Sequence, residues 1–241
     1  MDGPKVVFTI PIFGGLDITE TVVIGWFVIL IVLLVSLYLT SGLRKIPNTK
    51  HQILAEMLVG FVNNTVKKAM GERFMYFAPY IAALLLYSLL GSLVSLLGLR
   101  SVTADLNTTV AMALVTFVLI TYFKIKTNGM WGYIKSFGSP IVLLAPLNII
   151  SEIATPLSMS FRMFGNIAGG SIITSLLYMA LGAASKALHL SFTFGSFRLD
   201  AVQLFTPAVL SIYFDLFTGC IQAYIFAMLT MVNVSMAADK S

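Results

Sequence analysis

Residues 22–39 read VVIGWFVILIVLLVSLYL, an apolar run without a single charged side chain. A helix of about 20 apolar residues spans the hydrocarbon core of a bilayer. The rest of the chain agrees, since 58% of its residues are hydrophobic and only 10% are charged, against about 45–50% and about 25% in soluble domains. With so few charges the chain is neither a soluble enzyme, nor disordered, nor a nucleic-acid binder. We expect an integral membrane protein.

The spacing of the charges predicts further crossings. Between the charged clusters lie long apolar segments, too continuous for the alternating strands of a barrel. The last two segments exceed the length of one perpendicular crossing, so we expect them to form a long tilted helical hairpin. The fold class is therefore an all-α integral membrane protein in a single membrane domain. After an external N-terminus (1–20), the five predicted crossings are 21–42, 74–99, 106–124, 140–186 and 200–236.

Residues 50–72 follow a different pattern. Apolar side chains fall near one face of a helix there, while Glu56, Lys67 and Lys68 fall on another. This pattern predicts an amphipathic helix on the cytoplasmic membrane surface. With the N-terminus outside, the inside loops hold ten Lys and Arg residues and the outside loops hold four. The positive-inside rule therefore predicts an external N-terminus and a cytoplasmic C-terminus.

Glu152, Arg162 and Asp215 are charged residues inside predicted crossings. Such residues cost about 2.5–3.5 kcal/mol each at a helix centre on insertion scales, and they usually mark an ion or substrate path. A structural salt bridge of Arg162 with Asp215 or Glu152 is the alternative. A polar stripe at helical spacing favours the path, because it offers groups that can hold water without a permanent charge. The stripe consists of Ser151, Thr155, Ser158, Arg162 and Asn166, and a second one of Ser211, Asp215, Thr218 and Gln222.

No motif of a hydrolase or cofactor enzyme occurs in the chain. It lacks a phosphate-binding loop, an HExxH pair and a dinucleotide fingerprint. One cysteine and two distant histidines predict neither a disulfide nor a metal site. We therefore expect a chain that is not an enzyme by itself and holds no cofactor or metal.

A family resemblance begins at PLSMSFRMFGN, residues 156–166. The run resembles the signature P-L-S-L-S-x-R-L-F-G-N of subunit a of rotary F-type ATP synthases. Other segments match in the same order, and together they cover the chain from about residue 20 onward. These are GFVNNTVK (60–67), TADLNTTVAMAL (103–114), PLNIISE (146–152) and IQAYIFAMLTMVNVSMA (221–237).

The resemblance implies roles for individual residues. Arg162 would be the essential arginine that faces the carboxylate of each passing c subunit, with Asn166 and Gln222 beside it. Glu152 would lie near the cytoplasmic half-channel. Asp105 and Asn107 would lie near the external entrance. Ser158 also joins the expected ion pathway as a member of the polar stripe.

Two positions depart from the family pattern. Ser171 stands where members often have a glutamate, and Asp215 stands where they often have a histidine. We therefore expect Asp215 to perform alone the external relay that the glutamate–histidine pair performs elsewhere. The transported ion implied is a proton, with sodium as the alternative.

The resemblance also implies partners and a location. These are the c-subunit ring, the b-subunit peripheral stalk and the rest of the F1Fo complex, in a bacterial plasma membrane and without nucleic acid. Two alternatives would also explain the charged residues inside the predicted crossings: an independent secondary ion transporter and a structural scaffold. A transporter predicts internal repeats and discontinuous helices, and the sequence contains no repeat that supports it.

Overall fold

Long helices dominate the computed structural model, which describes residues 5–11, 16–42, 49–138, 142–187, 191–194, 197–200 and 212–238. Within these residues, five helical stretches are long and apolar enough to cross a membrane: Glu20–Thr40, Glu72–Leu97, Leu106–Phe137, Ala145–Ala183 and Leu216–Ala238. The predicted all-α integral membrane class is confirmed. The α-helices of the described part are α1 (Glu20–Thr40), α2 (Lys50–Met70), α3 (Ala78–Leu93), α4 (Leu106–Phe137), α5 (Ala145–Ala187) and α7 (Gly219–Ala238).

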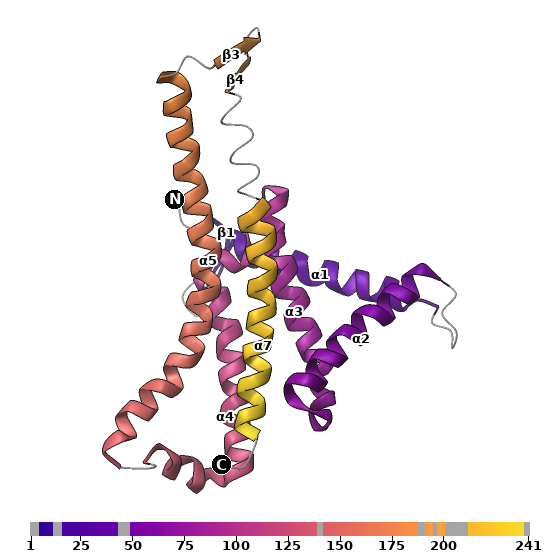
Figure 1. Cartoon of the computed structure of the whole chain (residues 1–241), viewed down its shortest axis with the longest axis vertical. Coiled ribbons are helices and arrows are strands. Elements are labelled where there is room, and N and C mark those ends of the chain that lie inside the picture. Colours follow the sequence, from indigo (N-terminus) through magenta and orange to yellow (C-terminus); the bar gives the residue numbers. More distant parts are fainter. Residues whose placement is uncertain are drawn as a thin grey trace.

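The helices α3, α4 and α7 run side by side, and α5 lies along them and extends beyond them at its C-terminal end, toward β3 and β4 (Figure 1). The helix α1 crosses this bundle at a wide angle (Figure 1). One apolar cluster joins the bundle to α2 through Val66 and Met70, while a second joins α5 to it through Met159 and Met163. One face of α5 is thus packed against the bundle, and its opposite face carries exposed apolar residues such as Phe161.

Turns and caps set the ends of these helices. A 3₁₀ turn, Glu72–Phe77, leads into α3, and others follow at Val94–Leu97, Val102–Ala104 and, before α5, Val142–Leu144. The predicted third crossing ends at 124, whereas α4 continues to Phe137. The lysines that mark the predicted end lie within the helix. The part beyond 124 bends at Gly129, whose φ of 73° suits a residue without Cβ.

Two short antiparallel hairpins, which hydropathy did not predict, supplement the helices of the described part. The strands β1 (Val6–Ile10) and β2 (Leu16–Thr19) precede α1, and β3 (Ser191–Phe194) and β4 (Phe197–Asp200) follow α5. Their β-branched and aromatic residues favour strands. Of the predicted crossing 200–236, residues 201–211 lie outside the described part, and a π-helical segment, Ile212–Thr218, leads into α7.

The helix α2 coincides with most of the predicted amphipathic segment. Val66 and Met70 are buried against the bundle, whereas Ile53, Met57 and Phe61 remain exposed. An exposed apolar face on a helix rich in polar residues suits a membrane surface. Its location on the cytoplasmic surface stays a prediction.

Candidate functional site

Arg162 lies on the open side of α5. Its side chain is exposed, although its neighbour Met163 is fully buried against α3, α4 and α7. Among the described side chains, Arg162 has no ion-pair or hydrogen-bond partner; the side chain of Asp215 lies outside this part of the structure. A guanidinium carries five donors and stays charged in proteins. The helix therefore presents a permanent positive charge on a face that no described acid neutralises.

A polar cavity of about 330 Å³ adjoins Arg162. The helix α5 contributes Ser151, Thr155 and Ser158 to its lining, three of the five residues of the predicted polar stripe, and α7 contributes Asn233. Thr155 donates to the carbonyl of Ser151 at 3.0 Å, which leaves the hydroxyl oxygen free to accept. Hydroxyl and amide groups of this kind can hold water beside the arginine.

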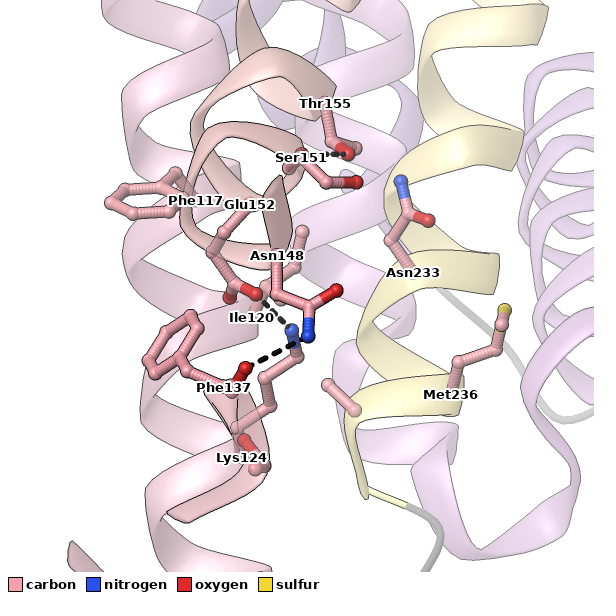
Figure 2. A pocket seen from close by; sticks show the side chains of 12 residues that line it. Phe117, Ile120, Lys124, Phe137, Asn148, Ser151, Glu152, Thr155, Asn233 and Met236 are labelled. Carbon is pink, nitrogen blue, oxygen red and sulfur yellow. Dashed lines mark hydrogen bonds and ion pairs between the residues drawn. The ribbon is translucent and has the colours of Figure 1, made fainter. Parts of the chain in front are cut away.

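A second cavity, of about 430 Å³, continues from the first toward the N-terminal end of α5. The two cavities share Ser151, Thr155 and Asn233 in their linings. Figure 2 shows this space between α4, α5 and α7, with Glu152 and Lys124 on one side and Asn233 on the other. Glu152 and Arg162 are ten residues apart on α5, or about 15 Å along a helix. The linings of the two cavities together thus extend along α5 from Glu152 to Arg162.

Glu152 is paired with Lys124 of α4. The distance between Lys124 Nζ and Glu152 Oε2 is 2.6 Å, and the two side chains are 33% and 13% exposed. The other carboxylate oxygen, Oε1, is buried and has no hydrogen-bond partner among the described residues. Glu152 is therefore neutralised by Lys124, and the predicted alternative of a Glu152–Arg162 salt bridge does not form here.

Asn166 and Gln222 tie α5 to α7. Asn166 Nδ2 donates to Gln222 Oε1 at 2.7 Å, and Gln222 is only 2% exposed. Asn166 follows Arg162 by four residues, one helical turn. The hydrogen bond thus fixes the two helices to each other directly beside the arginine.

Asp105 caps the N-terminus of α4. Its Oδ1 accepts a hydrogen bond from the backbone N–H of Asn107 at 3.0 Å, and its Oδ2 accepts one from Thr21 of α1 at 2.5 Å. Asp105 is 9% exposed, while the side chain of Asn107 is exposed. Asp105 and Thr21 therefore connect the first residues of α1 and α4.

Ser171 lies away from the two cavities. Its Oγ donates to the carbonyl of Ala168 at 2.8 Å, a bond to its own helix, and it lines neither of the cavities described here. Asp215 belongs to the π-helical segment before α7, and its side chain lies outside the described residues.

Comparison with known proteins bears on this arrangement. The family model described as the ATP synthase A chain matches residues 22–235. The chain belongs to this family. A sodium-ion-specific ATP synthase subunit a from Propionigenium modestum is 30% identical over 97% of this chain and 84% of its own length. The subunit a of Bacillus pumilus is 34% identical over 86% of each chain, and that of Moorella thermoacetica is 31% identical over 92% of each chain.

As a member of the ATP synthase A chain family with five long apolar helices, the chain is a multi-pass bacterial membrane protein. Sequence reasoning missed two polar residues of its site. Lys124 counted only as a cytoplasmic basic residue, although its place at the end of an apolar segment is a signal for an interfacial ion pair. Asn233 follows Gln222 by eleven residues, three helical turns, so the two share a face of α7.

Proposed function

We propose that this chain is the ion-translocating stator channel subunit of an F-type ATP synthase. Two aqueous half-channels lead to the membrane interior from opposite sides, and Arg162 separates them. Arg162 discharges the carboxylate of each passing c subunit and so couples ion flow to ring rotation. The observation that carries the proposal is the exposed Arg162, which has no partner among the described side chains, beside a cavity on the open face of α5.

Electrostatics explains the role of the arginine. A fixed guanidinium in a medium of low dielectric constant favours the ionised form of a nearby carboxylate. A loaded c-subunit carboxyl that arrives at Arg162 therefore releases its ion. The guanidinium keeps its own proton, so it acts as a gate and carries nothing. It also repels cations, which prevents a direct leak between the half-channels.

The cavity between Glu152 and Arg162 is the proposed cytoplasmic half-channel. Its lining supplies hydroxyl and amide groups from α5 and α7, and Ser158 is the hydroxyl-bearing residue one turn from the arginine. Water bound to such groups provides a route for a cation. The release of one unit charge down the membrane potential supplies about 2.3 kcal/mol per 100 mV.

The external half-channel is proposed to start near Asp105 and Asn107 and to use Asp215 as its relay. Buried hydroxyl groups continue inward from Asp105, since Ser160 Oγ donates to Thr109 Oγ1 at 3.1 Å and Thr109 follows Asp105 by one helical turn. Ser171, at the position where family members often carry an acid, adds a second polar group to the pathway. The relay role rests on the sequence position of Asp215.

The partners follow from the same role. The exposed face of α5 would contact the c-subunit ring, and the b-subunit stalk would hold the chain against the soluble head of the F1Fo complex. The subunit is non-catalytic and needs no cofactor. The orientation has the N-terminus outside and the C-terminus in the cytoplasm. The ion is a proton or, as the name of the Propionigenium relative indicates for that protein, sodium.

Reconstituted complex tests the gate. We expect Arg162→Ala to abolish ATP-driven ion uptake while the complex stays assembled. Arg162→Lys should also lose coupled transport, because a desolvated ammonium can give up its proton. Uptake is measured at low and high sodium, and the sodium dependence of the wild type identifies the ion. Normal uptake by an intact Arg162→Ala complex would overturn the proposal.

A further inference from the structure

An ion pair occupies the wide end of the proposed cytoplasmic half-channel. Lys124 and Glu152 come from different helices, α4 and α5, and both line the larger cavity. Lys124 follows the start of α4 by 18 residues, or about 27 Å of helix. That length is close to the thickness of the hydrocarbon core, about 30 Å, so we expect the pair near one edge of the core, where a cation enters or leaves the cavity.

Lys124 is the cation bonded to Glu152 within the described residues. The phenol of Tyr133, also on α4, lies close enough to interact electrostatically with Glu152. The helix α7 brings Asn233, Met236 and Ala237 to the same cavity, none of them charged, and α5 itself adds the amide of Asn148. Within the described residues, the ammonium group of Lys124 is therefore the one opposite charge bonded to the carboxylate of Glu152.

We propose that Lys124 is the resident counter-charge of Glu152 and sets how strongly the half-channel holds the transported cation. The inference rests on the proposed function and extends it to a residue outside the motifs that define the family resemblance. Lys124 is a positioning residue in this scheme. It acts through Glu152 and does not itself carry the ion.

The reason is the charge of the cavity with and without the lysine. In the pair, Oε2 is bound to Lys124, and a passing cation meets a net charge of zero plus polar oxygens. Without Lys124, the carboxylate is mostly buried and uncompensated, and Oε1 already has no hydrogen-bond partner among the described residues. An uncompensated buried carboxylate recruits a cation strongly. Such a site would fill at low ion concentration and release slowly.

The test uses the whole ATP synthase complex in proteoliposomes with the soluble head outside. ATP-driven uptake is measured while either sodium at fixed pH or protons at fixed sodium are varied in the outer medium. We expect Lys124→Met to lower the half-saturating cation concentration on that side by roughly tenfold, as the loss of a close, half-buried opposite charge implies. The methionine keeps an apolar stem of similar length. The ion dependence measured from the lumen during ATP synthesis should stay as in the wild type.

Four further variants control the result. Lys124→Arg keeps the charge and should behave like the wild type. Lys126→Met removes the same charge from an exposed position two residues along α4 and should leave both ion dependences unchanged. Glu152→Gln leaves Lys124 unpaired and should raise the half-saturating concentration. The double variant Lys124→Met/Glu152→Gln restores neutrality and should return to within about twofold of the wild type, since the two effects cancel in one pair.

Three results would overturn the inference. The first is an unchanged half-saturating concentration in an assembled Lys124→Met complex, and the second is a shift seen only from the lumen. The third is a double variant that is worse than both single variants, because it would indicate a packing role. Failure of the proposed function looks different: the wild-type complex would take up no ion, or Arg162→Ala would take it up normally.

Discussion

Arg162 and Glu152 lie on the same helix, but among the described side chains only Glu152 is paired with an opposite charge. Glu152 has Lys124 as a partner at 2.6 Å, while Arg162 has no ion-pair partner among the described side chains. A charge that needs only to be tolerated in a membrane is paired. A charge that must act on a group from another subunit has to remain available. The difference between the two residues therefore supports a neutralised channel wall and an active gate.

Asp105 carries a stability prediction at the residue scale. Asp105→Ala removes the N-cap of α4 and the acceptor for Thr21, which should destabilise the chain by about 1–2 kcal/mol. Asp105→Asn should retain most of the stability, because asparagine caps as well as aspartate does. The measurement is the thermal midpoint of release of this chain from detergent-solubilised complex. Thr21→Val isolates the loss of the side-chain bond alone, and an unshifted midpoint in Asp105→Ala would show that the cap is not needed.

Single residues also mark the limit of what the sequence predicts. Charges in apolar segments identify Glu152, Arg162 and Asp215 because each is improbable where it stands. Their partners are harder to predict, because the Lys124–Glu152 pair and the Asn166–Gln222 bond join helices whose contacts depend on packing. An aspartate directly before a helical segment, as at Asp105, is typical of an N-cap. The family resemblance implies instead a place near the external entrance of the ion pathway. Capping and a place near the entrance are compatible.

At the scale of elements, hydropathy predicts the long apolar helices of the described part well and says little about where each helix ends. The bilayer requires long apolar helices, so five such segments are visible in composition alone. Beyond the hydrocarbon core this constraint disappears. There α4 continues past Lys124 to a bend at Gly129, and strands form beside α1 and α5. These features follow local preferences that a charge count does not contain.

Close approach of α7 to α3 supports a prediction at this scale. A Cβ at Gly219 would lie 3.0 Å from Ser92 Oγ and 3.2 Å from Ser92 Cβ. Gly219→Val should therefore push α7 away from α3 and destabilise the chain by about 1–3 kcal/mol. It should also slow ion transport, because Gln222 lies one turn further along α7. Gly219→Ala should have a weaker effect that Ser92→Gly relieves.

A glycine in an open position provides the control for this prediction. A Cβ at Gly60 of α2 meets nothing within 4 Å, so Gly60→Ala should be neutral or slightly stabilising. The thermal midpoint and the ATP-driven uptake rate are compared across all variants. Equal behaviour of Gly219→Val and Gly60→Ala would show that α7 tolerates a shift at its start.

For the whole molecule, the contacts gather the basic segments at one end of the bundle. Arg73 donates to the carbonyl of Ala238 at 3.1 Å, and Thr127 donates to the same carbonyl at 3.4 Å. The end of α7, the end of α4 and the Lys124–Glu152 pair therefore lie together. The first residues of α1 and α4 meet at Asp105 instead. The positive-inside rule predicts that the end with Arg73 and Lys124 faces the cytoplasm, the side that we propose for the larger cavity.

This polarity leads to a prediction for Asp215. If Asp215 is the external relay, Asp215→Asn should slow ion flow that starts from the lumen of proteoliposomes while ion binding from the outer, cytoplasmic side stays normal. An amide cannot take up and release a proton, and it attracts a cation less than a carboxylate does. The rate of ATP synthesis is therefore measured against lumenal pH between about 6 and 9, so that a proton-dependent step lost with the carboxyl would appear as a changed pH profile.

Two readouts test this prediction: the subunit content of the complex, and the side of the membrane from which ion flow is slowed. We expect Asp215→Asn complexes to contain the c ring and the stalk in wild-type amounts, since one uncharged substitution of equal size leaves the helix unchanged. Lys124→Met should show the opposite sidedness in the same preparation, which makes each variant the control for the other. Wild-type synthesis by Asp215→Asn over the whole pH range would assign Asp215 a structural role. The external relay would then have to consist of water and hydroxyl groups, such as the buried pair Ser160 and Thr109, which hold no charge of their own.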